Sequence, residues 1–432
     1  MKSFFNLLGN SLIAVVTNFL VWSTVVYWVY LTTGSVLGTS IMSGMYLVLV
    51  MVSGFWLGSI VDHNKKKTAM LISSFATLFF FACALLMYSV SPKESFTTVE
   101  SVRLWVVVAF LLFGVIAGNI RSIALPTAVP LLVPEEKRDR ANGMTGTIMG
   151  IAFALSNVGA GFGYAYIGIS GVLSIALGAT VIAILHLLYI SIPEPEKVAP
   201  EVHEVPKSKL DIKGTIAIVR SIPGLFPLIL FTTFNNFLGG VFMSLMDPYG
   251  LTLVSVQVWG TLWGFLSCGF IIGGLVIAKR GLGKNPVRTL FVVNGIIWTI
   301  SIFMTIQHSI VLLGVCMFIY LCMFPFIEAS EQTVMQKVVP QERLGRVFGF
   351  AQSVEQSASP ITAFVIGPVA QFIFIPFMTT GVGVELIGSW YGVGVGRGLG
   401  LVFTLAGIIG LVATIIAARS RSAKMLSTQF KN

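Results

Sequence analysis

Charged residues are scarce in this chain of 432 residues. They make up 10% of it, with 27 Lys and Arg against 17 Asp and Glu. Because soluble domains usually carry about 25% charged residues, this composition excludes an ordinary soluble fold. Cysteine and histidine are also rare, with four of each. The cysteines lie inside apolar runs without metal-site spacing and the histidines are scattered, so we expect no disulfide framework, metal centre or cofactor.

Motifs for ATP hydrolysis or enzyme catalysis are missing as well. The chain has no Gly-x-x-x-x-Gly-Lys-(Ser/Thr) loop, so a gradient is the expected energy source for any work it does. It has no nucleophile–base or metal-ligand cluster, which argues against a membrane enzyme. A channel is disfavoured because no filter-like ring motif is present.

Long apolar runs fill the chain instead. Residues are 56% hydrophobic, and the mean hydropathy is +0.91. We count twelve predominantly apolar runs of around 20 residues, each long enough to cross a bilayer as a helix. Lys and Arg gather in alternate loops, which places both termini in the cytoplasm of a cell, expected to be bacterial. This bias also explains the net charge of +10, so the expected partner is the lipid bilayer and not nucleic acid.

A polar segment divides the runs into two sets of six. Residues 193–224 begin rich in Pro and Glu and then become basic and amphipathic, which predicts a flexible cytoplasmic linker followed by a helix on the membrane surface. We therefore predict an all-α polytopic membrane protein with two pseudo-symmetric six-helix bundles. The bundles are residues 1–192 and 225–418, and residues 419–432 form a basic cytoplasmic tail.

The two halves repeat one charged phrase. "VPEEKRDRANG" begins at Val133 and "VPQERLGRVFG" begins at Val339. Each copy follows the fourth predicted span of its half. Positive-inside bias makes short basic loops look alike, but it does not reproduce the Val-Pro-x-Glu-x-x-x-Arg-x-x-Gly spacing. Parallel repeats of this kind are typical of large secondary transporters.

The loop after the second predicted span carries a further signature. "GSIVDHNKKK", which starts at Gly58, resembles the Gly-x-x-x-Asp-(Arg/Lys)-x-x-(Arg/Lys)-(Arg/Lys) motif of the major facilitator superfamily. "ALPTAVPLLVPEEKRDRANG" and "VMQKVVPQERLGRVFG" resemble its macrolide-efflux branch of drug–proton antiporters. The resemblance implies export of amphiphilic small molecules, macrolides among them, by proton antiport through alternating access, in a monomer. The alternative cargo is an endogenous lipid-like or siderophore-like metabolite.

The resemblance also implies a conformational latch. Its residues are Gly58, Asp62, Lys65 and Arg346, with the Asp62 carboxylate near the start of the helix that carries Arg346. A carboxylate near a helix N-terminus is stabilised by about 0.3–1 kcal/mol. The alternative is that Asp62 is only a solvated loop charge.

The resemblance further implies a central cavity lined by the first, fourth, seventh and tenth spans. These spans hold polar side chains within apolar runs. The candidate substrate-binding residues are Asn18, Trp22, Asn119, Asn235 and Asn236. The alternative for the amides is that they only form hydrogen bonds between helices.

Ionisable side chains inside spans are costly and are functional candidates by default. The candidates for proton coupling are Glu328, Glu331, Glu355, Arg121 and Asp247. Glu328 and Glu331 share one helix face, and two carboxylates in partly dry surroundings cannot both ionise cheaply. Proton binding would then break a pair between Arg121 and one of these glutamates. The alternative is a static salt bridge of the glutamates with Lys337 or Arg346, and Glu355 is the rival coupling site.

Overall fold

The structure is a computed structural model that describes residues 2–134, 138–192 and 212–430. Its regular elements are all helical, and no strand occurs within these ranges. The chain divides into an N-terminal unit, residues 1–201 with 254–265, and a C-terminal unit, residues 202–253 with 266–432. The predicted linker segment is residues 193–224. Its residues 193–211 lie outside the described residues, and its remainder contains helix α6.

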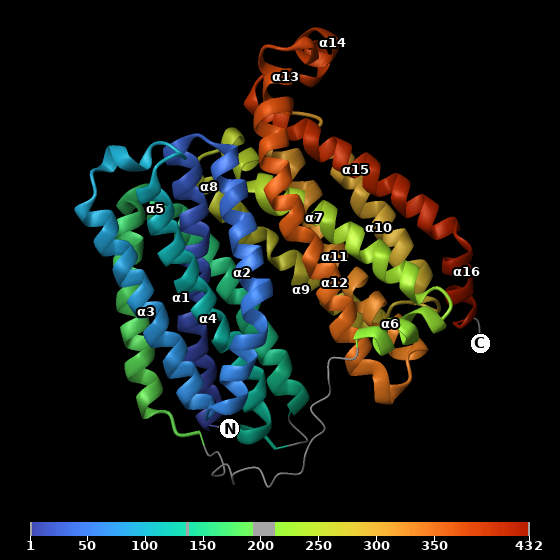
Figure 1. Cartoon of the computed structure of the whole chain (residues 1–432), viewed down its shortest axis with the longest axis horizontal. Helices are drawn as coiled ribbons and strands as arrows, with labels where there is room; N and C mark the ends of the chain where they lie inside the picture. Colours follow the sequence, from blue (N-terminus) through green and yellow to red (C-terminus); the bar gives the residue numbers. More distant parts are fainter. Residues whose placement is uncertain (1, 135–137, 193–211, 431–432) are drawn as a thin grey trace. The chain divides into compact units, whose positions relative to one another are not determined.

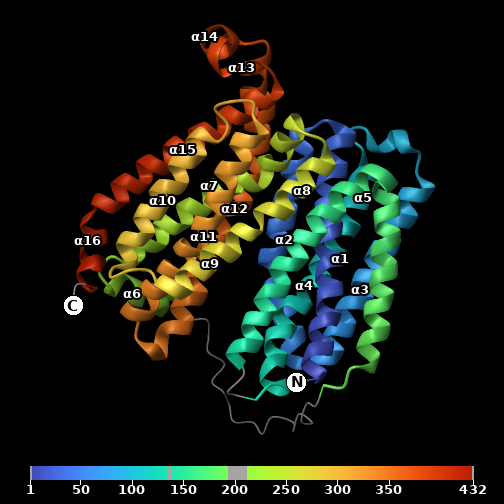
Figure 2. The same ribbon diagram turned by 180° about the vertical axis from the view of Figure 1, so that it is seen from behind.

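The N-terminal unit is built from long apolar helices and one short 3-10 turn. In Figures 1 and 2, α1, α3 and α4 run alongside one another. The elements are α1 (Lys2–Thr33), α2 (Val36–His63), α3 (Lys66–Val90), η1 (Lys93–Phe96), α4 (Val102–Leu132), α5 (Arg138–Tyr189) and α8 (Val256–Leu266). Helix α8 comes later in the chain, and its residues 256–265 belong to this unit.

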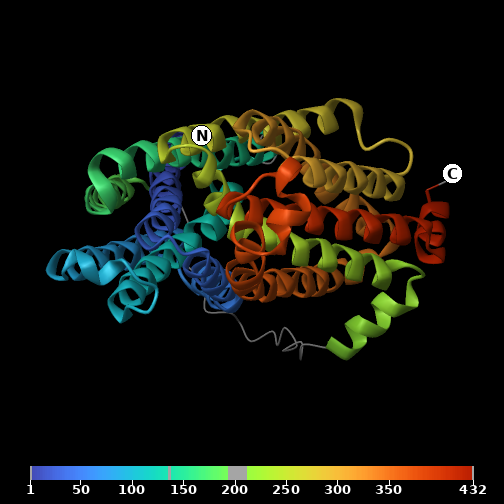
Figure 3. The same ribbon diagram turned by 90° about the horizontal axis from the view of Figure 1, so that it is seen from above.

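The C-terminal unit pairs α7 with α12, α10 with α15 and α9 with α11. Seen from above in Figure 3, α7, α10 and α15 extend side by side. Its elements are α6 (Ile212–Ser221), α7 (Leu225–Leu253), α9 (Cys268–Arg280), α10 (Pro286–Phe303), α11 (Ile310–Val338), α12 (Gln341–Val369), the π-helix η3 (Ala370–Phe374), α13 (Ile375–Thr379), α14 (Val382–Tyr391), α15 (Val395–Arg419) and α16 (Arg421–Thr428).

Eleven helical segments of the described chain are long and apolar enough to cross a membrane. Helices suit this setting because every backbone hydrogen bond is made within the segment. One of the eleven, Ile148–Tyr189, has 42 residues, about twice the length that one crossing needs. It is interrupted at Gly168, whose φ of 62° and ψ of −176° are not helical and favour glycine. The fifth and sixth predicted spans both lie within this one segment, one on each side of Gly168.

Glycine permits a close backbone approach in the N-terminal unit, between α5 and α8. A Cβ atom on Gly161 would lie 2.6 Å from the carbonyl oxygen of Val256, and one on Gly260 would clash with the carbonyl oxygen of Asn157. Backbones can approach this closely only where no side chain intervenes. The contact holds residues 254–265 against α5, whereas the prediction had assigned them to the second bundle.

The short helices α6 and α16 lie at one end of the C-terminal unit (Figure 1). Contacts with α7, α10 and α11 hold α16 there. Leu426 of α16 and the following Phe430 are buried in a cluster with Leu228 and Leu290. Lys337 Nζ stands 4.6 Å from the centre of the Phe430 ring. The side chain of Asn285 bonds Ser427, which joins α16 to the start of α10. These contacts tie the end of the chain to α7, α10 and α11.

Candidate functional site

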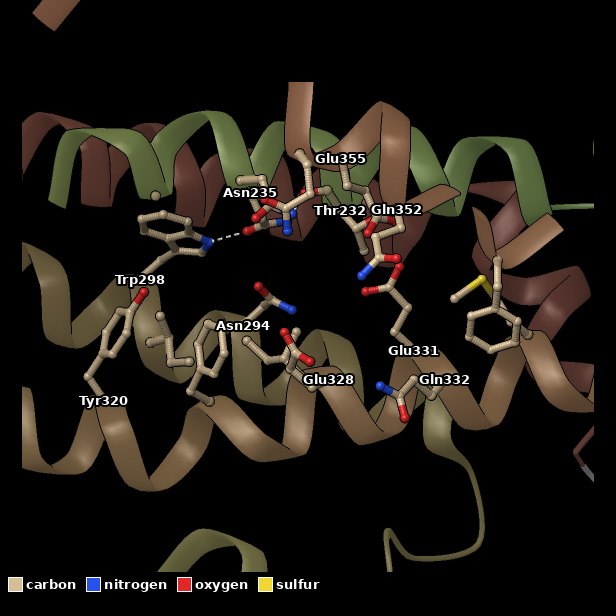
Figure 4. A pocket seen from close by; sticks show the side chains of 18 residues that line it. Thr232, Asn235, Asn294, Trp298, Tyr320, Glu328, Glu331, Gln332, Gln352 and Glu355 are labelled. Carbon is tan, nitrogen blue, oxygen red and sulfur yellow. Dashed lines mark hydrogen bonds between the residues drawn. The ribbon is translucent and has the colours of Figure 1, made fainter. Parts of the chain in front are cut away.

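A cavity of about 220 Å³ lies inside the C-terminal unit, between α7, α10, α11 and α12. Its wall is unusually polar for a membrane bundle, and Figure 4 shows carboxylate and amide side chains converging on it from three sides. The charged and amide members of the lining are Asn235, Asn236, Asn294, Glu328, Glu331, Gln332, Gln352, Glu355 and Gln356. Polar groups in such a bundle face one another because lipid offers them no hydrogen bonds.

All three intramembrane glutamates predicted for proton coupling line this cavity. The closest interaction, however, is between helices. Glu331 of α11 and Glu355 of α12 line the same cavity and lie close enough to interact electrostatically. Thr232 Oγ1 donates to Glu355 Oε1 at 2.8 Å. Two carboxylates that interact in partly dry surroundings cannot both ionise cheaply, so this pair can share one proton.

One oxygen of Glu331 has an unusual environment. Oε1 is buried and has no hydrogen-bond partner among the described residues. A buried ionised oxygen without a donor is strongly destabilised, which favours either a proton or a cationic group at this position. Glu328, one turn earlier on α11, is exposed at the same cavity and is open to a ligand.

The predicted amides of α7 are held in place at the cavity wall. Trp298 Nε1 donates to Asn235 Oδ1 at 2.7 Å, drawn as a dashed line in Figure 4. Asn235 Nδ2 in turn donates to the Phe231 carbonyl oxygen at 2.8 Å. Asn236 Nδ2 donates to the Thr232 carbonyl oxygen at 3.2 Å. Both side chains line the cavity, but part of their bonding capacity is used by the protein itself.

Sequence reasoning missed the other polar members of the wall. Gln352 and Gln356 lie on the helix face of Glu355, three residues before it and one after it. That i, i+3, i+4 spacing was a readable signal. Trp298 and Asn294 sit in α10 among apolar residues, and no spacing rule singles them out.

The remaining substrate-binding candidates lie in the N-terminal unit and bond within it. Asn18 Nδ2 of α1 donates to the Val115 carbonyl oxygen at 3.1 Å and to Asn119 Oδ1 at 3.3 Å, both on α4. The ring of Trp22 packs on Tyr46 of α2, with centroids 4.2 Å apart. The two amides therefore join α1 to α4, the alternative that the sequence left open, and substrate contact stays a prediction for all five residues.

Arg121 is buried deeply in the N-terminal unit, with 2% of its surface exposed. Its Nη1 donates to Asn10 Oδ1 of α1, and its Nη2 donates to Ser74 Oγ of α3 at 2.6 Å. Asn10 Nδ2 also donates to the Ala183 carbonyl oxygen of α5 at 2.8 Å. One guanidinium thus organises four helices through neutral partners. The predicted pair of Arg121 with a glutamate stays a prediction.

The other predicted residues contribute less to the described site. Asp247 is half-buried on α7 and is not among the residues that line the cavity. The side chains of the latch residues Asp62 and Arg346 lie outside what the structure describes, as does the environment of Gly58. Lys65 is exposed at the start of α3. The latch therefore stays a prediction.

The cavity can bind a proton or an organic cation. Its three carboxyl groups lie beside the rings of Trp298, Tyr320 and Phe324, and aromatic faces attract ammonium groups. Among the described residues, no group of three or more His, Cys, Asp or Glu side chains is arranged to hold a metal ion. Protons and amines are thus the ligands that fit this wall chemically.

Comparison with protein families places this geometry in context. The family model described as Major Facilitator Superfamily matches residues 7–363. Macrolide efflux protein A of Streptococcus pyogenes is 24% identical over 376 residues, which cover 83% of this chain and 87% of that protein. Macrolide efflux protein A of Enterococcus faecalis is 28% identical over 271 residues, which cover 60% and 80% of the two chains.

Solved transporter structures share the fold at low sequence identity. A peptide transporter POT in complex with sulfate has a TM-score of 0.70 at 14% identity, covering 100% of this chain and 96% of that chain. A bacterial homologue of the human lysosomal transporter Spinster has a TM-score of 0.66 at 13% identity, covering 99% and 97%. At such identities the likeness concerns the fold alone.

Proposed function

Because the chain belongs to the Major Facilitator Superfamily, we propose that this membrane transporter exports drug-like amphiphilic small molecules, macrolides among them, by proton antiport through alternating access. The two relatives named for macrolide efflux support the cargo class. The protein would work as a monomer in the bacterial cell membrane, with both termini in the cytoplasm.

The observation that supports proton coupling is the pair of Glu331 and Glu355, which come from two different helices. The two carboxyl groups line one cavity and interact electrostatically, and Glu331 Oε1 is buried without a donor among the described residues. A proton drives transport only if its affinity differs between two conformations. A pair contributed by two separate helices meets this condition, because a small shift of α11 against α12 separates the carboxyl groups and changes how tightly they hold a proton.

This pair changes the coupling hypothesis drawn from sequence. The sequence favoured Glu328 with Glu331, which share a helix face. The structure supports Glu331 with Glu355 as the proton pair and leaves Glu328 as the exposed carboxylate of the cavity. Because Glu328 is open to a ligand, it is suited to bind a positive group of the cargo.

Transport in proteoliposomes with an imposed pH gradient tests the proposal. Glu331→Gln and Glu355→Gln should abolish uphill transport of a radiolabelled macrolide while sparing downhill exchange. Glutamine keeps the shape of the glutamate side chain but has no carboxyl group that can bind and release a proton. Glu385→Gln, which alters an exposed residue on α14, is the matched control and should transport normally. Wild-type accumulation by both cavity variants at equal expression would refute the coupling role, and absence of macrolide transport in the wild type would refute the cargo.

A further inference from the structure

A second and larger cavity lies in the N-terminal unit, at the end of α1 opposite the chain's N-terminus. Its volume is about 590 Å³, within the range of roughly 300–1,000 Å³ typical of small-molecule sites. The ends of α1 and α3, the turn η1 and the interruption of α5 at Gly168 form its wall. None of the residues predicted for transport belongs to it.

Three aromatic rings from three elements build one side of this cavity in advance of any ligand. Phe96 of η1 folds back onto the bundle and is 1% exposed. Its ring stacks on Tyr88 of α3 with centroids 5.1 Å apart, and it lies 5.6 Å from Trp28 of α1. The rings support one another at distances typical of stabilising aromatic pairs. The rings of Phe96 and Trp28 therefore form a fixed apolar support, and the partly exposed ring of Tyr88 is the one of the three that a ligand can contact.

Hydrogen-bond donors project from this apolar wall. Trp28 is 3% exposed, yet neither its indole N–H nor the hydroxyl of Tyr88 donates a hydrogen bond to any described residue. Indole offers a donor and no acceptor, and neither this N–H nor the Tyr88 hydroxyl is among the fully buried polar atoms of the described residues that lack a partner, so both can be reached from the cavity. Tyr164 of α5 also lines the cavity. The wall therefore favours a ligand that brings acceptor oxygens.

The charges at this cavity cancel. Lys93 and Glu94 are neighbours in η1, both are exposed, and they are the two charged members of the lining. A ligand with a net charge would find no excess of the opposite sign here. The C-terminal cavity differs in each respect, because it is smaller, at about 220 Å³, and carries three carboxyl groups.

We propose that this cavity is a second small-molecule site, which binds an uncharged amphiphile through its apolar body and its acceptor oxygens. Ether, ester or hydroxyl oxygens of the ligand would accept from Trp28 Nε1 and from the Tyr88 hydroxyl, while the apolar body packs on the aromatic wall. The inference rests on the N-terminal unit alone and does not depend on proton antiport or on the glutamate pair.

Photolabelling of the full-length protein in detergent tests this site. The probe is an uncharged aryl tetraethylene glycol ether that carries a diazirine, and labelled peptides are located by mass spectrometry. Labelling should fall on peptides that contain Trp28, Tyr88 or Phe96, and an excess of the same ether without the diazirine should compete it away. Label confined to lipid-facing surfaces, or label that does not saturate, would overturn the proposal.

Matched variants separate binding from folding. Tyr88→Phe and Trp28→Phe keep an aromatic ring and remove one donor, which should weaken binding about three- to tenfold. Tyr166→Phe removes a hydroxyl from a residue of α5 that is 76% exposed and outside the cavity, and it should bind as the wild type does. Equal affinity of Tyr88→Phe and Tyr166→Phe, both folded by thermal unfolding, would contradict the site.

A charge variant of the probe and a transport variant of the protein complete the test. Adding a terminal ammonium or carboxylate to the ether should weaken competition, because the wall carries no excess charge. Glu331→Gln should bind the neutral probe as the wild type does. Loss of binding in that variant would show that the cavity is not an independent site, whereas loss of its uphill transport alone concerns only the proposed coupling.

Discussion

The hydroxyl of Thr232 on α7 donates a 2.8 Å hydrogen bond to Oε1 of Glu355 on α12. Glu331 on α11 lines the same cavity as this hydroxyl. Side chains from three helices of one unit, α7, α11 and α12, therefore line one cavity with two carboxyl groups. Because α7 and α12 pack against each other, this hydroxyl would, under the proposed coupling, link the ionisation of Glu355 to helix packing. Proton-driven transport requires a proton site whose affinity changes with conformation, and a hydrogen bond between two helices is one way to provide it.

Replacing Thr232 should therefore slow pH-driven transport. Thr232→Val keeps the shape of the side chain and removes the donor, which should lower the initial rate of uphill transport about tenfold, as expected for a lost hydrogen bond to a charged group. Thr232→Ser retains the hydroxyl and should restore most of that rate. Equal rates for the Val and Ser variants in proteoliposomes would show that the hydrogen bond has no part in coupling.

Removal of Asn10 should destabilise the N-terminal unit. Asn10→Ala takes a partner from the buried guanidinium of Arg121 and leaves the Ala183 carbonyl oxygen without its donor. The expected loss is about 2–4 kcal/mol in the free energy of unfolding. Thermal unfolding in detergent measures it. Asn6→Ala, which alters an exposed residue one turn earlier on α1, should leave the unfolding temperature within error, and similar shifts for both variants would argue against the Arg121 cluster.

Adding a side chain at Gly260 should disturb the contact of α8 with α5. A Cβ atom there would clash with the Asn157 carbonyl oxygen, so Gly260→Ala should cost about 1–3 kcal/mol of stability through overpacking. Gly295→Ala in α10 is the matched control, because a Cβ atom at that position meets nothing within 4 Å. Thermal unfolding of the two variants compares them directly. An unchanged Gly260→Ala protein would show that the helices separate easily at this point.

Hydropathy and spacing predict most of the fold. Apolar runs of sufficient length become helices because the backbone has no other way to satisfy its hydrogen bonds in lipid. The sequence does not predict that α8 packs with the N-terminal unit. This packing depends on backbone contact at Gly161 and Gly260, and a hydropathy pattern carries no information about such a contact. The fifth and sixth predicted spans were expected as separate helices, and Gly168 interrupts them without a polar loop.

The candidate site was predictable in its residue types and less so in its pairing. Intramembrane glutamates stand out in any apolar run, and all three line one cavity. Sequence spacing joins Glu328 to Glu331, but the interaction of Glu331 with Glu355 depends on how α11 packs beside α12. The same holds for Asn10 and Arg121. Their side chains are bonded, but 111 residues separate them in the sequence, so local spacing does not connect them.

Orientation in the membrane is open to a direct test. The distribution of Lys and Arg predicts that both termini face the cytoplasm and that the turn η1 faces outward. In intact cells, a membrane-impermeant maleimide should label Thr98→Cys, which lies in the loop after η1, but not Lys424→Cys on α16. Both residues are exposed. The wild type, with its native Cys268, sets the background, and the reverse labelling pattern would invert the topology.

Glu328 should determine cargo charge preference without driving transport. Its side chain is exposed at the cavity that holds the Glu331–Glu355 pair, so it can contact a ligand directly while the pair holds the proton. Glu328→Gln removes the charge and keeps the size, so the KM for a cationic drug-like amphiphile should rise about tenfold, as for one lost charge-assisted bond. The KM for an uncharged amphiphile should stay within about twofold, because such cargo makes no ion pair at this position.

The decisive measurement is accumulation driven by a pH gradient, with each cargo at a saturating concentration. Under these conditions Glu328→Gln should concentrate both cargoes as the wild type does, whereas Glu331→Gln should concentrate neither. The two variants should differ because, at a saturating cargo concentration, the transport rate no longer depends on how tightly the cargo binds. The rate still depends on the proton site, so its loss is not compensated. Failure of Glu328→Gln to concentrate the uncharged cargo would move the coupling role back to the helix-face pair of Glu328 and Glu331.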